Sequence, residues 1–315
     1  MLLRAMLDIL RFLPLFAFWA SLPGCASWVP DTSNYEVFEL TFDVSLPEGT
    51  RSEDTILWVP VPLEDGVQVL LEANTPKRAI TGASDTYGNR FSSVTGATQD
   101  SYSWSWIVKR SLDGPGKLSA EPTHHYLSPN RLVPVGGESA HRAIKVVESA
   151  GPRPLMRALY DQVLEDMDYS KIGEGWGTGS TEWACEEGYG NCTDFHALFI
   201  SMSRSLDVPA RFTIGFPLPE SEAGVVKGYH CWAHYWDYAQ GWTPVDISEA
   251  DKHPEQKEFF FGNLDANRIS MTAGRDLILT PPQQGPPLNY MVRAYAEKKG
   301  QPVQATTTVR FQRVR

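Results

Sequence analysis

The sequence predicts an α+β protein in which an N-terminal antiparallel β-sandwich is followed by a domain of mixed helices and strands and by a C-terminal β-hairpin. Alternating strand patterns fill most of residues 35–110, amphipathic helices follow residue 137, and two short strand patterns end the chain. With 315 residues, of which 42% are hydrophobic and 21% charged, the chain is long enough for one large or two ordinary domains. The expected segments are a signal peptide (1–24), a linker (25–34), the sandwich (35–135), the mixed domain (136–285) and the hairpin (286–315).

The first 25 residues have the pattern of a bacterial export signal. Arg4 and Arg11 precede an apolar stretch over residues 12–22, which is about half of the ~20 residues that a membrane span needs. The motif Leu22-Pro23-Gly24-Cys25 resembles a lipobox, and this implies a lipoprotein signal peptide with diacylation of Cys25. Because Ala26 follows the cysteine, the resemblance also implies the periplasmic face of the outer membrane. The alternative is an ordinary signal peptide with a cysteine there by chance.

Composition argues against a nucleic-acid partner. The formal net charge is −10 and no basic run offsets it, whereas duplex binding depends on Lys and Arg that neutralise phosphates. We therefore expect no nucleic acid among the partners, and the sequence predicts no cofactor.

Residues 35–110 alternate in the way that half-buried strands do. The alternating apolar side chains are Phe38, Leu40, Phe42, Val44, Tyr102, Trp104, Trp106 and Val108. Residues 56–61 predict a further strand near a sheet edge, because Pro60 lacks an N–H for the ladder. Core packing is expected for Trp58, Trp104 and Trp106, and a carbohydrate-binding face is the alternative.

Beyond an ordered crossover loop at 111–137, apolar spacing predicts helices over residues 138–149 and 154–167. Residues 169–190, rich in glycine and aromatic side chains, have no clear periodicity and are expected to form a loop against a cleft. At the end of the chain, residues 288–297 and 303–313 are expected to pair as the hairpin.

The most regular helix pattern begins at Asn191-Cys192-Thr193-Asp194. Its buried stripe is expected to contain Phe195, Leu198, Phe199, Met202 and Leu206. Asn191 suits the N-cap and Asp194 the first turn, which puts Cys192 at the first helical position. A helix N-terminus and a nearby imidazolium both lower the pKa of a thiol. Cys192 is therefore a candidate nucleophile, and an inert buried thiol is the alternative.

Two strands follow, and each supplies a partner for that thiol. Over residues 228–238, period-two alternation places His230, Trp232, His234 and Trp236 on one face and Cys231 on the other. A tight turn near residue 240 would bring Asp246 back toward His230. Cys192, His230 and Asp246 can then perform acyl transfer: the thiolate attacks an amide carbonyl, the imidazole protonates the departing amine, and the carboxylate orients the imidazole.

The attack on the amide carbonyl produces an oxyanion, which needs hydrogen-bond donors to stabilise it. The Cys192 backbone N–H is one candidate, and the indole N–H of Trp176 or Trp183 is the other. His196 lies one helical turn beyond Cys192, and we expect it to satisfy a hydrogen bond in the core rather than to take part in the chemistry.

A zinc site is a rival interpretation of the same residues, since Cys192 with His196 and His230 with His234 look like ligand pairs. Four residues of strand separate His230 from His234 by about 13 Å, too far for one tetrahedral ion, so no metal is predicted. Cys185 and Cys231 could form a disulfide in an oxidising compartment, and the sequence leaves this open.

These motifs resemble the transglutaminase-like superfamily. The matching elements, in order, are Gly190-Asn191-Cys192, Leu206-Asp207-Val208-Pro209-Ala210-Arg211, His230-Cys231-Trp232 and Trp242-Thr243-Pro244-Val245-Asp246. The resemblance covers about residues 138–280 and implies a papain-like α+β core with these three residues as the triad. His234 stands where an acidic residue is usual in the family, which implies a less acidic cleft.

The resemblance implies a cysteine-dependent enzyme that acts on peptide or isopeptide amide bonds through a thioester. Its partners would be a peptide or protein substrate in the envelope and, through the lipid on Cys25, the membrane. Hydrolysis is expected rather than cross-linking, because water is abundant there. The alternative is a catalytically silent binding or scaffold lipoprotein, since fold alone does not guarantee activity.

Overall fold

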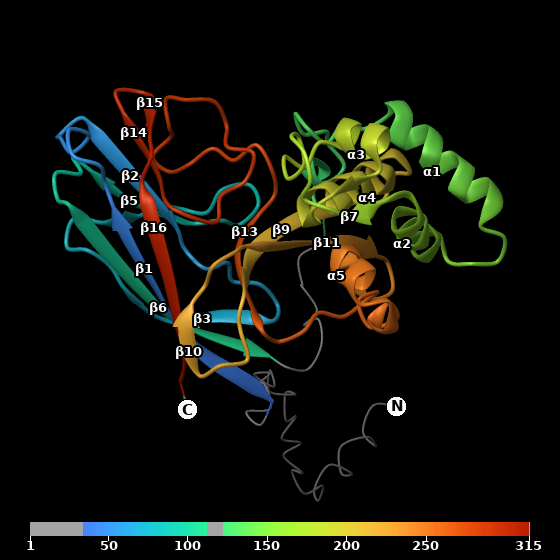
Figure 1. Ribbon diagram of the computed structural model, residues 1–315, viewed down its shortest axis with the longest axis horizontal. Coiled ribbons are helices and arrows are strands. Elements are labelled where there is room, and N and C mark those ends of the chain that lie inside the picture. The colour runs from blue at the N-terminus through green and yellow to red at the C-terminus, as the bar shows by residue number, and fades with distance from the viewer. Residues whose placement is uncertain (1–33, 112–121, 315) are drawn as a thin grey trace, which may run out of the picture. The chain divides into compact units, whose positions relative to one another are not determined.

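The computed structural model describes residues 34–111 and 122–314, shown in Figure 1. In this part of the chain, antiparallel sheets and helices combine, and the predicted α+β class is confirmed. The predicted signal peptide, Cys25 and the linker up to residue 33 lie outside the described residues. Within the described ranges, no helix has both the length and the apolarity to cross a bilayer.

The first sheet of the sandwich is built on the two long alternating strands that the sequence predicted. Its members, in spatial order, are β10 (Ala223–Val225), β16 (Thr306–Val314), β1 (Tyr35–Ser45), β6 (Ser101–Ser111) and β3 (Gln68–Asn74). The apolar residues of β1 and β6 are buried at every second position. Phe42, which pairs with Trp104, also contacts the ring of Trp106 edge-on at 5.3 Å.

The second sheet places β2 in its interior. Its members, in spatial order, are β15 (Gln301–Val303), β14 (Tyr295–Lys298), β2 (Thr55–Pro60), β5 (Phe91–Thr95) and β4 (Ile80–Thr81). The prediction of an edge position for this strand was wrong, because β14 from the C-terminal region pairs along it. Pro60 is the last residue of β2, at the strand's end.

The three tryptophans of the sandwich belong to its core, as expected. Trp58 and Trp104 are fully buried and Trp106 is 1% exposed. The indole N–H of Trp58 donates to the carbonyl of Pro281 at 2.9 Å, and that of Trp104 to the hydroxyl of Ser92 at 2.9 Å. The carbohydrate-face alternative is wrong for these residues, because their rings are enclosed.

The C-terminal strands complete both sheets of the sandwich. A hairpin is present, but it joins β14 to β15, with Ala296 opposite Val303. The chain then turns away, and β16 pairs with β1 from Val37 to Ser45, as Figure 1 shows for the two strands. Val309 and Phe311 are buried by this pairing, and β1 gains a neighbour on a side that would otherwise be an open edge.

A third sheet and the helices form the remainder of the described chain. The sheet is antiparallel, in the order β12 (Gly241–Val245), β11 (His230–Asp237), β9 (Ala210–Pro217) and β13 (Arg268–Ala273). The α-helices are α1 (Gly137–Ser149), α2 (Leu155–Asp166), α3 (Thr181–Glu187), α4 (Cys192–Ser205) and α5 (Ile247–Lys252). The short elements are η1 (His124–Tyr126), β7 (Asp168–Tyr169), β8 (Tyr189–Gly190) and η2 (Pro254–Gln256). The two helices predicted over 138–149 and 154–167 are confirmed as α1 and α2.

The segment at 169–190 is not wholly a loop, because it contains α3. This helix is capped by the Ser180 hydroxyl, which accepts the backbone N–H of Trp183, and it ends at Gly188 in the left-handed region (φ +67°). Only 7 residues long, it is too short to show an apolar period in the sequence.

Helix α4 is buried on every side, from Cys192 to Arg204. The predicted apolar stripe faces β11, where Phe199 contacts Tyr235. Helices α1, α2, α3 and α5 pack against its other faces. Polar residues there are paired: Ser201 bonds to Ser139 at 2.7 Å, and the Arg204 Nη2 donates to the Ala210 carbonyl at 2.9 Å. These bonds fix the C-terminal half of α4 against α1 and the start of β9.

The sandwich and the third sheet are joined by a polar clamp and an aromatic contact. The Gln68 side chain donates to the Ser270 carbonyl at 2.8 Å and accepts the Ser270 N–H at 2.9 Å. Phe42 and Phe216 pack edge to face with ring centroids 5.7 Å apart. The two parts therefore share one hydrophobic cluster.

Candidate active site

The first turn of α4 is fixed by a reciprocal capping box. The Asn191 side chain accepts the Thr193 N–H at 2.8 Å, and the Asp194 carboxylate accepts the Asn191 N–H at 2.9 Å. The predicted N-cap and first-turn roles of Asn191 and Asp194 are confirmed. Cys192 is the first helical residue, where a backbone N–H has no partner within the helix.

Asp194 also ties the glycine-rich loop to this turn. Its carboxylate accepts the N–H of Gly177 at 2.6 Å and of Gly179 at 2.8 Å. Both glycines have positive φ, +81° and +66°, and a β-carbon on Gly179 would collide with the Arg275 guanidinium. These bonds hold the segment against the first turn of the helix that carries Cys192.

The structure brings Cys192, His230 and Asp246 together. His230, the first residue of β11, places Nε2 2.7 Å from Oδ2 of Asp246. A side-chain hydrogen bond links His230 to Cys192, for which Nδ1 is the remaining ring nitrogen. Asp246 follows β12 directly and caps α5 by accepting the Glu249 N–H at 3.2 Å. The hairpin of β11 and β12 brings Asp246 back toward His230, because Val245, the residue before Asp246, lies opposite Ala233.

The charges of Cys192, His230 and Asp246 stabilise one another. Burial opposes the imidazolium, but the neighbouring Asp246 and Cys192 outweigh it and raise the pKa of His230 to about 10. Burial likewise opposes the thiolate, yet hydrogen bonds from Cys231 and His230 and the charge of His230 hold the pKa of Cys192 well below its usual value. The pair is therefore set up as a thiolate and an imidazolium near neutral pH.

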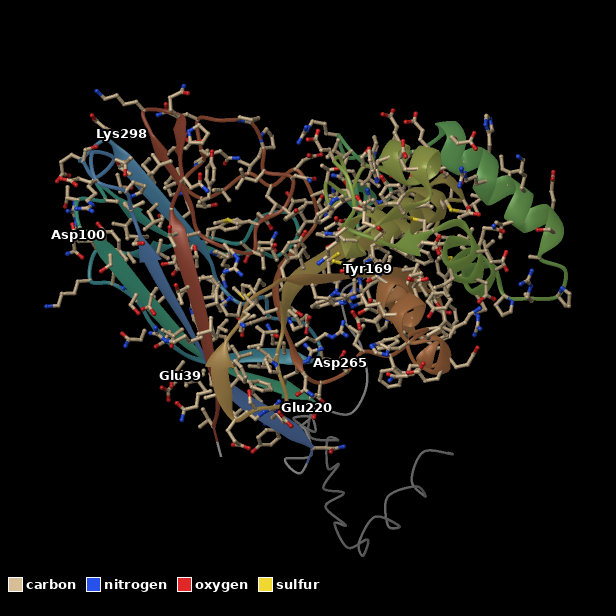
Figure 2. The ribbon with its side chains drawn as sticks, in the orientation of Figure 1. Glu39, Asp100, Tyr169, Glu220, Asp265 and Lys298 are labelled. Carbon is tan, nitrogen blue, oxygen red and sulfur yellow. The ribbon has the colours of Figure 1, made fainter. Side chains whose placement is uncertain are left out.

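Arg268, at the start of β13, is a site residue that the sequence interpretation missed. Its Nη1 donates to Oδ2 of Asp246 at 2.9 Å, and its Nη2 pairs with Asp265, which is labelled in Figure 2. The guanidinium also lies over the Trp232 ring at 4.9 Å. Despite complete burial, the charges of His230 and Arg268 hold the pKa of Asp246 well below its usual range. No local motif signals Arg268, because its ion pair with Asp246 is formed across the sheet.

His196 occupies the structural role that was expected of it. Its Nδ1 lies 2.7 Å from the Cys192 carbonyl oxygen, and its Nε2 accepts the Ile247 N–H at 3.1 Å. These contacts assign the proton to Nδ1 and leave the ring neutral. Burial lowers the pKa of His196, which agrees with a neutral ring. It therefore braces the first turn of α4 against the start of α5.

Neither candidate indole is free to act as an oxyanion donor. The single N–H of Trp176 donates to the Gly173 carbonyl at 3.0 Å, and that of Trp183 to the Tyr189 carbonyl at 3.0 Å. An indole has one donor, and in both residues it is used. This prediction is corrected: of the donors considered, only the Cys192 backbone N–H remains.

His234 does not lie in an open cleft. It is 5% exposed, and burial together with the charges of Arg211 and Arg110 holds the pKa of His234 well below its usual value. His234, which stands where the resemblance leads one to expect an acidic residue, therefore lies in an arginine-rich interior and not on a substrate surface. Across residues 34–111 and 122–314, no group of three or more His, Cys, Asp or Glu side chains is arranged to hold a metal ion.

Cys231 lies next to the candidate nucleophile. Its thiol is in hydrogen-bonding contact with that of Cys192, and its Sγ is 3.7 Å from Nδ1 of His196. The sequence placed Cys231 on the strand face opposite to His230, and its thiol contacts His196 of α4, the helix that begins at Cys192. Cys185 is a free thiol near Arg142, so the disulfide between Cys185 and Cys231 that the sequence left open is not formed.

The site is narrow. Cys192 is 2% exposed and His230 6% exposed. Partly exposed side chains that interact with the pair are Glu249, whose Oε1 is 3.8 Å from the His230 Nε2, and Lys252, which pairs with Glu249 at 2.6 Å. The Lys252 ammonium also lies over the ring of Tyr169 at 4.0 Å, a residue labelled in Figure 2. At these exposures, only a small group can reach the Cys192 sulfur as the side chains stand.

The pH dependence of alkylation should distinguish Cys192 from Cys185. The pKa of Cys192 is lowered, so its thiolate persists as the pH falls, whereas burial raises the pKa of Cys185. With iodoacetamide we expect a labelling rate at Cys192 that is nearly constant from about pH 8 to pH 6, and a rate at Cys185 that falls about tenfold per pH unit. Peptide mapping after timed labelling measures both rates in one sample. Parallel slopes for the two thiols would contradict the ion pair.

Fold and geometry together define a class: a papain-like α+β core in which a cysteine at a helix start meets an imidazole that a buried carboxylate orients. Residues 144–247 match the family model of the transglutaminase-like superfamily core, and this part of the chain is similar to that superfamily.

Individual relatives are distant in sequence. An uncharacterised protein of Haemophilus influenzae is 24% identical over 327 aligned residues, which cover 87% of this chain and 88% of that protein. A crystal structure from Cytophaga hutchinsonii, provisionally named a cysteine protease, is 16% identical with a TM-score of 0.56 and covers 90% of this chain and 91% of its own. This likeness shows a common fold over nearly the whole chain. The periplasmic domain of TgpA from Pseudomonas aeruginosa is 16% identical with a TM-score of 0.38, over 69% of this chain and 92% of its own.

Proposed function

We propose that the protein is a cysteine-dependent enzyme that cleaves peptide or isopeptide amide bonds through a thioester on Cys192. The observation that carries the proposal is the contact series from Cys192 to His230 and from His230 to Asp246, with Nε2 to Oδ2 at 2.7 Å. An inert buried cysteine needs no such imidazole, and a structural histidine needs no fully buried carboxylate.

Each step of the reaction can be assigned to an atom of this chain. The Cys192 thiolate attacks the amide carbonyl carbon, and the Cys192 N–H donates to the developing oxyanion. His230 gives its proton to the departing amine and then accepts one from the water that cleaves the thioester. Asp246, fixed by Arg268 at 2.9 Å, keeps the imidazole in its orientation and stabilises its charged form.

Water is proposed as the acyl acceptor. Cys192 and His230 expose 2% and 6% of their surfaces, and water is the smallest nucleophile that can enter such an opening beside a thioester. A lysine acceptor carried on a protein would need space for its long side chain next to Cys192. Hydrolysis is therefore favoured over cross-linking.

The place of action is proposed to be the cell envelope. The signal pattern over residues 1–24 and the lipobox at Cys25 support export and a lipid anchor at the periplasmic face of the outer membrane. The substrate would then be a peptide or protein of the envelope. Metabolic labelling with a fatty-acid analogue checks the anchor: wild-type chain should incorporate it, and Cys25→Ser should not.

The second candidate is a catalytically silent scaffold, and one observation favours it. The Cys192 sulfur is nearly enclosed, so a protein that only kept the fold could retain these contacts as packing. The two candidates differ in the reactivity of the thiol, which can be measured without knowing the substrate.

Alkylation of the His230→Ala variant tests the proposal. We expect iodoacetamide at pH 6.5 to label wild-type Cys192 selectively and His230→Ala at least about tenfold more slowly, because the thiolate loses its counter-charge. His141→Ala, a change at an exposed histidine on α1, is the matched control and should label like wild type. Equal rates in wild type and His230→Ala would favour the scaffold.

The acyl adduct is the direct product to seek. After incubation with peptides from an envelope extract, intact-mass analysis of the wild-type chain should show an added acyl mass that maps to Cys192 and is removed by hydroxylamine. The Cys192→Ala chain should show none. An adduct of the same mass on both chains would place it elsewhere.

A further inference from the structure

Two guanidinium groups are buried where the sandwich meets the third sheet. Arg211 of β9 is 6% exposed and Arg110 of β6 is 3% exposed. Among residues 34–111 and 122–314, Nε and Nη2 of Arg211 and Nε and Nη1 of Arg110 have no hydrogen-bond partner, and neither guanidinium forms an ion pair with a carboxylate. A buried charge without a counter-charge is costly in free energy, so these N–H groups indicate a ligand site.

Arg211 and His234 share one face of the third sheet. They are directly opposite in the pairing of β9 with β11, so both side chains leave the sheet on the same side, with β-carbons about 5 Å apart. This side faces away from α4, because Cys231, on the other face of β11, contacts His196 of that helix. The Thr213 hydroxyl lies 3.4 Å from Nδ1 of His234, which leaves Nε2 for another partner.

Arg110 faces this side of the third sheet from the sandwich. It is directly opposite Gln68 in the pairing of β6 with β3, so the two side chains lie on the same face of their sheet. The Gln68 amide bonds to the backbone of Ser270 on β13, a strand of the third sheet. Gln68 and Arg110 therefore both point toward the layer that carries Arg211 and His234. In agreement, burial and then the charges of Arg211 and Arg110 lower the pKa of His234.

The charges at this junction do not cancel. Burial and the neighbouring cations keep His234 neutral. Burial lowers the pKa of Arg110 and of Arg211, and the charge of Asp65 opposes that effect in both. The Asp65 carboxylate is engaged elsewhere, since Oδ1 accepts two backbone N–H groups at 3.0 and 2.9 Å and Oδ2 lies 3.4 Å from the Ser270 hydroxyl. Two cations beside one carboxylate leave one unit of positive charge to be balanced.

We propose that Arg211, Arg110 and His234 enclose a binding site for a small monovalent anion of the size of chloride. The inference goes beyond the proposed function and does not rest on it. Chloride accepts several N–H groups at once, and it is small enough for a site whose members are at most 6% exposed. Water would accept the same N–H groups but would bring no charge. The bound anion holds β6 of the sandwich against β9 and β11 and stabilises this junction.

The position opposite Arg211 provides a sharp test. In His234→Glu, the chain itself supplies a carboxylate directly across from the Arg211 guanidinium, within reach of an ion pair. A fixed carboxylate replaces the charge of the anion, so the variant should not need chloride. We expect His234→Glu in the absence of chloride to be at least as stable as wild type in its presence.

The test compares thermal unfolding of the wild-type chain and of His234→Glu in mixtures of sodium chloride and sodium gluconate at constant ionic strength. Gluconate is too large for the site and keeps the screening of surface charges equal. We expect the wild-type midpoint to rise by about 3 °C when chloride reaches tenfold its dissociation constant, and to saturate. The His234→Glu midpoint should not depend on chloride. Arg78→Met, a change in an exposed ion pair, is the control and should respond like wild type.

Crystals grown in sodium bromide locate the ion. We expect an anomalous peak beside Nε and Nη2 of Arg211 in the wild-type chain, and no peak there in His234→Glu. Bromide peaks at exposed cationic side chains alone would indicate an adventitious ion only and would overturn the inference.

Two outcomes of the unfolding experiment would also overturn it. One is a wild-type midpoint that is the same in chloride and in gluconate. The other is a His234→Glu midpoint that rises with chloride as much as the wild-type midpoint, which would place the effect of chloride elsewhere. Should His234→Glu fail to fold, the wild-type titration and the bromide peak decide. Neither readout involves Cys192, so failure here leaves the proposed function untouched.

Discussion

Changing Cys192 to alanine is expected to remove the burst of p-nitrophenol that the wild-type chain releases from p-nitrophenyl acetate, and to slow steady-state hydrolysis by about a thousandfold or more. The burst reports acylation of the sulfur that His230 ionises, and alanine has no atom to acylate. Acetate is a small acyl group, which suits a nucleophile that is 2% exposed. Absorbance in a stopped-flow instrument gives the burst amplitude per chain.

The matched control is Cys185→Ala. This thiol is half-buried near Arg142, and burial raises its pKa, so the variant should keep the full burst amplitude. Cys192→Ser keeps a side chain of similar shape, but it replaces the ionised sulfur with a hydroxyl. It therefore separates the chemistry of the sulfur from the packing of the side chain. A Cys192→Ala chain with an undiminished burst would assign the reaction to another residue and end the proposed mechanism.

The second large effect is a loss of unfolding free energy on substitution of Arg268. This residue is 2% exposed and forms ion pairs with Asp246 and Asp265. Methionine at this position fills similar volume but removes one of the two cations beside the fully buried Asp246 carboxylate and leaves only the His230 imidazolium. Loss of one partner from a buried pair costs roughly 3–5 kcal/mol of unfolding free energy. Guanidinium unfolding followed by circular dichroism should show the decrease as a lower midpoint.

The loss of unfolding free energy in the Arg268→Met chain should depend on pH. The folded-state pKa of Asp246 is lowered, so its charge stabilises the fold above the unfolded value of about 3.9, and that stabilisation is lost as the pH falls through the folded pKa. In the Arg268→Met chain, protonation of Asp246 removes the need for the missing guanidinium. The difference from wild type should therefore be greatest at neutral pH and shrink below about pH 4.

Arg78→Met serves as the control for this prediction. Arg78 and Glu53 form an exposed pair at 3.6 Å, with side chains 57% and 75% exposed, and such pairs contribute little to stability. If Arg268→Met were as stable as Arg78→Met at neutral pH, the buried ion pair would be unimportant. Arg268→Lys keeps the charge without the two-sided contact and is expected to fall between them.

The local patterns of the sequence predicted the helix that carries Cys192 because each of its signals is contained within a few residues. Asn191 caps the helix, Asp194 closes the capping box, and the apolar stripe faces β11. The hairpin that returns Asp246 toward His230 was predictable for the same reason, since strand alternation and a tight turn set the register.

The wrong predictions have separate causes. The strand at Thr55–Pro60 was expected at an edge, but β14, more than two hundred residues later, pairs with it. The indole N–H groups of Trp176 and Trp183 looked free because no sequence pattern identifies their acceptors, the nearby carbonyls of Gly173 and Tyr189. The helix at Thr181–Glu187 was missed because one short helix shows no period.

The sequence by itself determined the residue types of the site and their order: a cysteine at a helix start, then a histidine and an aspartate on paired strands. Only the tertiary structure decided that Arg268 braces Asp246, that Cys231 lies close to His196, and that Cys192 and His230 are almost wholly enclosed. The physical reason is that capping and alternation are short-range, whereas ion pairing, sulfur contact and burial depend on which strands and helices are brought together when the chain packs.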